Sequence, residues 1–332
     1  MLEEKDEFLI EQDLENWVIT KCDSWRDHYE ANYAQRFEEY YRLWRGQWSI
    51  EDRTRETERS KIITPALQQA VESSVAELEE ATFGRGKWFD IKDDIQDQET
   101  QDIEMLRKNL DQDFKKNKVR KGVAECLINA AVFGTGIAEV VLSEEKEMTP
   151  ATQPVMGGEL QAVGVTIRDR TCVKLRPVMP QNFLIDPVAT DIDSALGCAI
   201  DEFVSSHLVE QLQESGVYRD VDIVSASPDF DIEPDQDLTS FDDDKVRLTK
   251  YYGLVPRHLL EKAMQDEDAE DEEIVDLDQE ESSSYYVEAV VIIANGGTLL
   301  KASENPYMMQ DRPIIAFPWD VVPSRFWGRG VC

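Results

Sequence analysis

Basic residues are scarce in this chain of 332 residues. Lys and Arg number 35 against 69 Asp and Glu, which gives a formal net charge of −34. The chain is nevertheless 41% hydrophobic, so it can form a core and is not a disordered acidic tail. A folded protein with this charge repels polyanions and cannot hold nucleic acid by neutralising phosphates. It either never meets nucleic acid or meets it without adhering to it.

Long apolar runs, paired cysteines and clustered histidines are also missing. No run approaches the ~18 residues of a membrane span, and the acidic start lacks the basic region of a secretory signal. The cysteines are scattered, which predicts reduced structural thiols, and the three histidines lie far apart. No phosphate-binding loop motif is present. We therefore expect no catalytic residues, no metal site and no cofactor, and no contact with a membrane.

Helices are predicted in four segments of the first 133 residues. Residues 8–45 have aromatic residues at helical spacing, and Gly46 ends the pattern. Residues 62–81 form a second helix with Pro65 near its first turn, and residues 97–117 and 119–133 form two more. Between the second and third helices, FGRGKWFDI predicts a glycine-rich turn into a short strand.

Strands dominate the later sequence, which predicts a mixed α+β fold with antiparallel sheets. Gly134 and Gly136 end the fourth helix, and IAEVVL continues as a buried strand. Alternating residues predict further strands across residues 164–204, and the tail predicts a hairpin turning at Gly296-Gly297. Two acidic stretches, residues 220–244 and 265–282, are expected to be mobile loops.

Carboxylates in LIDPVATDID leave two interpretations. Asp186, Asp191 and Asp193 resemble a loose metal loop, but the glycine and closing glutamate of an EF-hand are missing. A turn rich in Asp and Pro is the favoured interpretation. A metal-dependent hydrolase is the weakest of the functional hypotheses.

The aromatic and basic residues around position 45 are candidates for contacts between subunits. Glu51, Asp52, Glu56 and Glu58 are interleaved with arginines, which fits ion pairs between subunits better than a phosphate groove. The aromatic residues form either intramolecular core or an interface with neighbouring copies. The candidate interface residues are Tyr41, Trp44, Arg45, Trp48, Arg53, Arg55 and Arg59.

The order of the segments resembles that of portal proteins, the head-to-tail connectors of tailed bacteriophages, and of short-tailed phages in particular. The matching segments are FEEYYRLWRGQW, RTRETERSKIITPALQQAVESSVAELEEATFGRGKWFDI, AECLINAAVFGTGIAEVVL, VKLRPVMPQNFLIDPVATD and VEAVVIIANGGTLLKASENPYMMQDRPIIAFPWDVVPSRFWGRG. The resemblance lies in the ordered series rather than in any single segment. It covers most of the chain except the acidic stretches.

The resemblance implies a structural protein rather than an enzyme. It implies a ring of identical subunits, usually twelve, at one vertex of the virion capsid, around a channel for DNA packaging and ejection. The implied partners are other copies of the chain, the terminase large subunit, a head–tail adaptor and tail proteins, the major capsid and scaffolding proteins, and double-stranded DNA in transit. Assembly would take place in the cytoplasm of a bacterial host.

The resemblance also implies a division of the chain. Residues 1–250 would form a wing-like domain, 246–282 a segment leading into the stem with an acidic mobile insert, and 283–320 a clip-like β region. Residues 321–332 would begin a second stem helix, so the chain is expected to be truncated. Candidate contacts with the motor or adaptor are Tyr285, Tyr286, Asn295, Tyr307 and Trp319.

A channel that carries DNA without binding it needs few cations, which agrees with the net charge. The rival hypothesis is an acidic interaction protein, such as a DNA mimic that occupies a basic groove on its partner. The first predicts a large ring in solution and the second a small compact particle.

Overall fold

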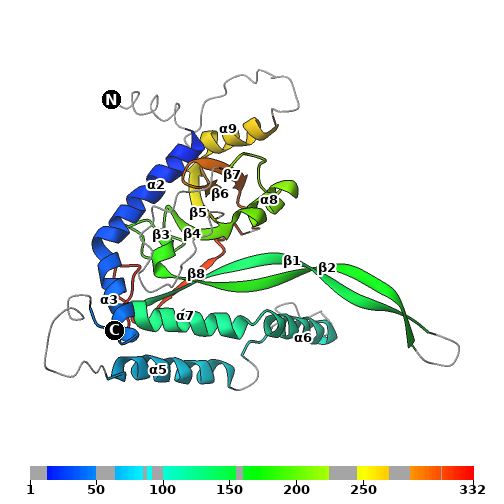
Figure 1. The fold of residues 1–332 in the computed structure, drawn as a ribbon, viewed down its shortest axis with the longest axis horizontal. Coiled ribbons are helices and arrows are strands. Elements are labelled where there is room, and N and C mark those ends of the chain that lie inside the picture. The colour runs from blue at the N-terminus through cyan, green and yellow to red at the C-terminus, as the bar shows by residue number, and fades with distance from the viewer. Residues whose placement is uncertain are drawn as a thin grey trace. The chain divides into compact units, whose positions relative to one another are not determined.

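A computed structural model describes residues 13–49, 64–84, 88–91, 100–154, 160–223, 245–268, 285–307 and 309–332. It contains helices and antiparallel sheets, which confirms the α+β class (Figure 1). The chain divides into two compact units. The five-strand unit comprises Met1–Tyr40, Met179–Arg312 and Val322–Trp327, and the ribbon unit comprises Tyr41–Val178, Pro313–Val321 and Gly328–Cys332.

This grouping differs from the predicted division at residues 250, 283 and 321. Strand β5 (Lys245–Pro256) pairs with β6 (Tyr286–Ala294) along its length, from Leu248 opposite Ala294 to Pro256 opposite Tyr286. A strand assigned to the wing and a strand assigned to the clip therefore belong to one sheet. Backbone pairing between distant segments, which composition does not reveal, sets the units.

The five-strand unit is built on an antiparallel sheet in the order β3-β4-β5-β6-β7. Its remaining strands are β3 (Phe183–Ile185), β4 (Gly197–Ser205) and β7 (Thr298–Glu304). The turn between β6 and β7 was expected at Gly296-Gly297, but positive φ angles fall on Asn295 (47°) and Gly296 (70°). Positive φ at both central residues is what a type I′ hairpin turn needs, and Asn-Gly is its preferred pair.

Helical segments precede the sheet of this unit in the sequence and follow two of its strands. Helix α2 (Leu14–Tyr29) continues through a π-helical segment, η1 (Glu30–Ala34), into α3 (Gln35–Trp44). This confirms the predicted helix from Leu14 onward, although the π-helical segment was not predicted. Residues 8–12 lie outside the described residues. Helices α8 (Ser206–Glu214) and α9 (Arg257–Asp268) follow β4 and β5 directly.

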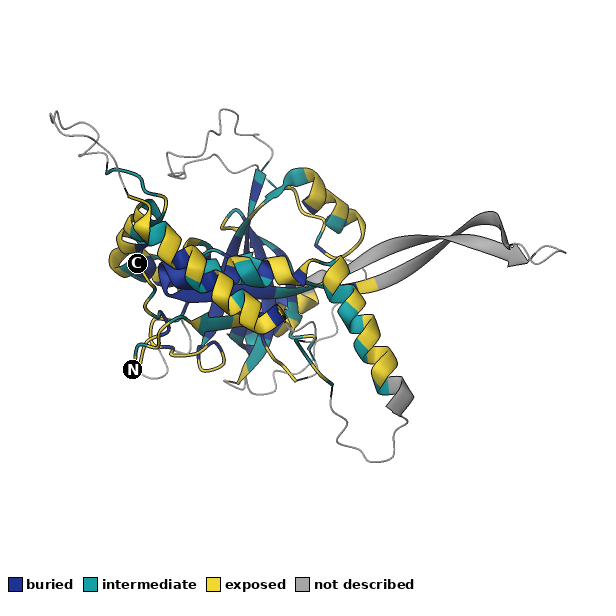
Figure 2. Ribbon diagram, turned by 90° about the horizontal axis from the view of Figure 1, so that it is seen from below, coloured by how far each residue is buried: buried dark blue, intermediate teal, exposed yellow. Residues whose placement is uncertain are grey.

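The core of this unit lies between α2, α9 and the sheet. Tyr251 of β5 is fully buried, with Trp17 edge-on at a centroid distance of 6.3 Å and Trp25 stacked at 6.0 Å. Leu259 and Leu260 of α9 belong to the same buried cluster. The aromatic face of the first helix is therefore intramolecular core over this part. Figure 2 shows the mostly buried strands and the exposed outer faces of the helices.

The ribbon unit combines three helices with a three-stranded sheet. The helices are α5 (Ala66–Phe83), α6 (Thr100–Lys116) and α7 (Val119–Phe133). The sheet has the order β2-β1-β8, from β1 (Thr135–Pro154), β2 (Leu160–Val178) and β8 (Ile314–Pro318). Helix α7 has the predicted bounds. Gly134 ends it at a φ of 97°, and a Cβ there would collide with the carbonyl of Gly328.

Two predictions for this unit were wrong in extent or type. The strand expected over IAEVVL continues to Pro154, because β2 pairs with it as far as Leu160 opposite Pro154. The short strand expected after Phe83 is absent from the described residues Trp88–Ile91, which are irregular. Most of the two acidic stretches lies outside the described residues, so their predicted mobility stays a prediction.

Candidate functional site

The predicted subunit-contact residues lie mainly in the ribbon unit. Tyr41 stacks on Phe133 at 6.3 Å and lies 5.8 Å from Trp44, measured between ring centroids. The guanidinium of Arg45 lies over the Tyr41 ring at 5.7 Å. Tyr41 therefore packs against residues of its own chain, whereas the Arg45 side chain is exposed. Trp48 is half-buried. Arg53, Arg55 and Arg59 lie outside the described residues.

The five predicted motor or adaptor contacts do not form one surface. Tyr285 and Tyr286 are 67% and 47% exposed at the start of β6, whereas Asn295 follows its last residue. At ~3.3 Å per residue, roughly 30 Å of strand separates the two ends. Asn295 is engaged in the turn, where its side-chain oxygen accepts the Arg247 amide at 2.9 Å.

The remaining two residues of that set differ from each other. Tyr307 is half-buried in the five-strand unit, and its amide donates to the side chain of Asn305. Trp319 belongs to the ribbon unit, where its amide donates to the carbonyl of Gly134 at 2.8 Å. Only the exposed tyrosine pair, Tyr285 and Tyr286, therefore has the character of an interaction surface.

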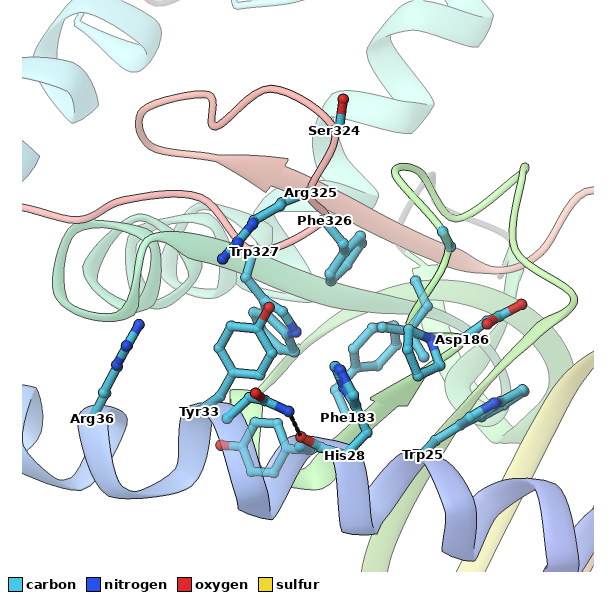
Figure 3. A pocket seen from close by; sticks show the side chains of 15 residues that line it. Trp25, His28, Tyr33, Arg36, Phe183, Asp186, Ser324, Arg325, Phe326 and Trp327 are labelled. Carbon is cyan, nitrogen blue, oxygen red and sulfur yellow. Dashed lines mark hydrogen bonds between the residues drawn. The ribbon is translucent and has the colours of Figure 1, made fainter.

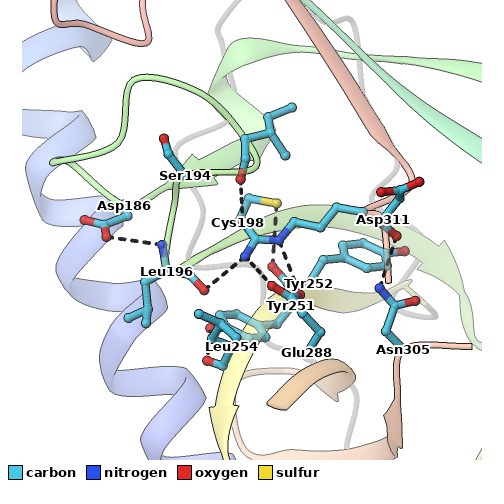
Figure 4. Close-up of polar contacts among 12 residues, drawn as sticks. Asp186, Ser194, Leu196, Cys198, Tyr251, Tyr252, Leu254, Glu288, Asn305 and Asp311 are labelled. Carbon is cyan, nitrogen blue, oxygen red and sulfur yellow. Dashed lines mark hydrogen bonds and ion pairs between the residues drawn. The ribbon is translucent and has the colours of Figure 1, made fainter. Parts of the chain in front are cut away.

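Buried charges in the five-strand unit neutralise one another. Arg312 donates to a carboxylate oxygen of Glu288 at 2.7 Å and to the carbonyls of Ile192 and Leu196. Figure 4 shows these contacts beside Cys198. Burial raises the pKa of the Cys198 thiol to about 12, so that thiol stays protonated at neutral pH. The network holds a loop against the sheet and offers no reactive group.

A second buried carboxylate, Asp201 of β4, joins helix α2 to the sheet. It accepts hydrogen bonds from Arg26 of α2 at 3.0 Å, from Arg247 at 2.5 Å and from the Thr249 hydroxyl at 2.7 Å. Burial, followed by the charge of Asp201, raises the pKa of the nearby Cys22 thiol. Two cations and a hydroxyl satisfy this carboxylate, which indicates a structural role.

The aspartates of LIDPVATDID form turns, in agreement with the favoured interpretation. Asp186 accepts the Val188 amide at 3.1 Å and the Leu196 amide at 3.5 Å. The Ser194 hydroxyl donates to the carbonyl of Asp191 at 3.1 Å. Within the described ranges, no group of three or more His, Cys, Asp or Glu is arranged to hold a metal ion.

An aromatic cavity of about 440 Å³ lies in the described part of the five-strand unit (Figure 3), which also has a hollow of about 560 Å³ lined by residues of α2 and α9. Its walls come from α2, η1, α3, the segment following Met179, and Val322–Trp327. The labelled residues are Trp25, His28, Tyr33, Arg36, Phe183, Asp186, Ser324, Arg325, Phe326 and Trp327. The sequence prediction placed Phe326 and Trp327 at the start of a stem helix and missed this cavity. The adjacent aromatic pair was the only available signal.

Trp327 is the centre of the cavity wall. Its ring centroid lies 6.0 Å from Tyr29, 5.8 Å from Tyr33 and 5.3 Å from Phe37. These three residues are spaced by four, which in a regular α-helix carries each successive side chain about 40° around the axis. The wider π-helical turn over Glu30–Ala34 reduces that drift, so all three rings face the same indole.

The histidines lie on separate helices, His28 on α2, His207 on α8 and His258 on α9. His28 lines the cavity with its ring centroid 6.1 Å from that of Tyr33, and its carbonyl accepts the side-chain amide of Asn32.

None of the described helices is both long enough and apolar enough to cross a bilayer. Compared with models of protein families and with curated protein sequences, the chain matches neither.

Proposed function

We propose that this chain is a structural subunit of a portal ring, through which DNA passes during genome packaging and ejection. The ring would lie at a capsid vertex of a tailed phage and would contain about twelve copies, as the resemblance of the ordered segments implies. Its partners would be the terminase motor, the tail adaptor, and the capsid and scaffolding proteins. The charge and the architecture of the ribbon unit support this proposal.

The observation that carries the proposal is the long ribbon of β1 and β2. Strand β8 pairs with β1 only from Thr135 to Glu139, and within the described residues no third strand continues along the ribbon. A two-stranded ribbon alone is marginally stable in water, and its outer edges offer unpaired backbone groups. Neighbouring copies in a closed ring would cover these edges and stabilise the ribbon.

The net charge supports the same function. A duplex inside a ring of strongly negative subunits meets more carboxylates than cations, so it can move. The same repulsion opposes ring assembly, but counterions screen it beyond a Debye length of ~10 Å at 0.1 M salt. Ring formation is therefore expected to strengthen as ionic strength rises.

The test is the assembly state of the purified full chain, measured by native mass spectrometry and negative-stain imaging at 0.05 M and 0.5 M salt. The proposal expects a closed ring that is more abundant at the higher salt. A compact monomer or dimer at both salt concentrations contradicts it. Capture of a basic protein by such a particle would favour the rival acidic interaction protein.

A further inference from the structure

The aromatic cavity is the one place in the described five-strand unit where exposed arginines lie beside a concave aromatic wall. Arg36 projects from α3 and Arg325 from the segment before Trp327, and both line the cavity. Figure 3 shows both guanidinium groups on the Trp327 side and Asp186 on the opposite side. Arginine and aromatic side chains together are the residues enriched at the centres of protein interfaces.

These two arginines have no ion-pair partner within the described residues. By contrast, Arg26 and Arg247 share Asp201, and Arg312 pairs with Glu288. Asp186 lines the same cavity but forms no ion pair with either arginine, and its two oxygens accept the amides of Val188 and Leu196. In a chain with 69 acidic and 35 basic residues, two unneutralised cations in one concave site indicate an acidic occupant.

A ligand that fills this cavity needs both carboxylates and an aromatic ring or other apolar group. Carboxylates pair with the planar guanidinium groups, and an apolar side chain fits the aromatic wall. A nucleic-acid strand is disfavoured because it carries a charge at every nucleotide, which the two arginines of this cavity cannot neutralise. An acidic peptide carrying phenylalanine has the required chemistry.

The chain itself contains such a peptide between Pro228 and Asp244. The stretch has no Lys or Arg, and it contains two phenylalanines, Phe230 and Phe241. Its acidic residues are Asp229, Asp231, Glu233, Asp235, Asp237, Asp242, Asp243 and Asp244. The chain between the described residues Ile223 and Lys245 has about ten residues for each direction, so its middle can reach about 30 Å from those two residues.

We infer that the aromatic cavity receives the stretch Pro228–Asp244 of a second copy of this chain. This inference rests on the proposed ring, because a ring of acidic subunits needs contacts in which opposite charges meet. Each copy would offer one cavity and one acidic stretch, which is the head-to-tail arrangement that closes a ring. Phe230 or Phe241 would lie against Trp327 and Phe183, with flanking carboxylates at Arg36 and Arg325.

The first experiment measures binding of a fluorescent peptide with the sequence of residues 228–244 to the full chain by anisotropy. The double variant R36E/R325E is expected to bind about tenfold more weakly or worse, because two attractive contacts become repulsive. Arg257→Glu on α9 is the matched control, since Arg257 is exposed but does not line the cavity. A peptide with both phenylalanines changed to alanine should also bind weakly. Equal binding to wild type and to R36E/R325E would overturn the inference.

The second experiment distinguishes a contact between copies from a contact within one copy. The first variant, R36E/R325E, loses the cavity's positive charges and keeps the acidic stretch. The second variant, Phe230→Ser with Phe241→Ser, loses both phenylalanines of the acidic stretch and keeps the cavity. If the contact joins two copies, mixing the variants yields mixed pairs in native mass spectrometry that neither variant forms alone. If no mixed pairs form, the assignment to a second copy is wrong.

Failure of this inference and failure of the proposed ring give different results. Wild-type rings that persist unchanged in R36E/R325E would refute the cavity contact and leave the ring proposal intact. A wild-type chain that stays monomeric would refute the ring proposal and, with it, the occupant from a second copy. Thermal unfolding of R36E/R325E, expected to match wild type because both side chains are exposed, excludes misfolding as the cause.

Discussion

The five-strand unit and the ribbon unit bury their apolar residues to different extents. Most of the largest fully buried side chains belong to the five-strand unit, with Tyr251, Phe183 and Leu248 among them. Large apolar side chains are more than half exposed in both units, such as Met105 and Leu142 in the ribbon unit and Val188 and Met309 in the five-strand unit. The units differ in the size of the core and in their strand edges, since the two-stranded part of the ribbon leaves edges that a partner would cover. Assembly contacts of the strand-edge kind are therefore expected in the ribbon unit, beside the contact proposed for the aromatic cavity.

The largest effect on the free energy of unfolding is predicted for removing the central aromatic residue of the five-strand unit. Tyr251→Ala is expected to lower the free energy of unfolding by about 3–5 kcal/mol, because Trp17 and Trp25 would border a cavity. Urea unfolding followed by circular dichroism measures it. Tyr251→Phe is the matched control and loses only the hydroxyl's bond to the carbonyl of Leu254, worth about 1 kcal/mol. Equal losses in the two variants would contradict the proposed core.

The next effect concerns the buried ion pair of the same unit. Arg312→Met is expected to cost about 3 kcal/mol, because Glu288 keeps its charge while losing its partner. The double variant Arg312→Met with Glu288→Met should recover much of that loss, since no buried charge then remains unpaired. Unfolding free energies of the two single variants and the double variant give the coupling. Additive losses would show that the pair is not coupled.

A smaller effect is an alkaline loss of stability due to Cys198. Its pKa is about 12 in the folded chain, against 9.0 for an unperturbed thiol, so the unfolded state loses its proton first. The stabilisation is therefore fully present below pH 9 and is lost as the pH rises from 9 towards 12. Against Cys198→Ala, the wild-type advantage in unfolding free energy should shrink by about 1.4 kcal/mol per pH unit above about 9. A constant difference between about pH 8 and about pH 10.5 would contradict the buried, protonated thiol.

The smallest effect on the isolated chain is expected in the ribbon unit. Leu142→Ser and Ile315→Ser change exposed side chains, so the free energy of unfolding should shift by no more than about 0.5 kcal/mol. Assembly, measured by sedimentation, should nevertheless weaken if neighbouring copies cover these residues. Val217→Ser, at a 45% exposed position of the five-strand unit that does not line the aromatic cavity, is the control and should alter neither property. If all three variants assemble alike, the two units do not differ as proposed.

Local sequence signals predicted many elements because each depends on neighbouring residues. Helix α7 was placed at its observed bounds, since an apolar helical stretch meets a glycine that can adopt a positive φ. The prediction failed for the far part of β1, where the charged run from Glu144 to Glu147 has low strand propensity. The backbone of this part of β1 pairs with β2, with Glu145 in register with Arg170, and only the folded ribbon shows that register.

The candidate sites were less predictable than the elements. The exposed pair Tyr285 and Tyr286 was selected from sequence, but Asn295 and Trp319 proved to be remote from it or in the other unit. The cavity was missed because its walls come from segments about 300 residues apart, from Trp25 to Trp327. Their meeting depends on long-range packing, to which residue spacing gives no access.

The amino-acid sequence alone determined the strongly negative charge, the α+β class and the positions of most helices and strands. These follow from composition and from the periodicity of adjacent side chains. Only the tertiary structure decided which charges neutralise one another. Arg312 found Glu288, and Arg26 found Asp201, whereas Arg36 and Arg325 were brought to one aromatic wall. The physical reason is that Coulomb energy and burial depend on distance in space, and folding sets that distance between residues remote in the chain.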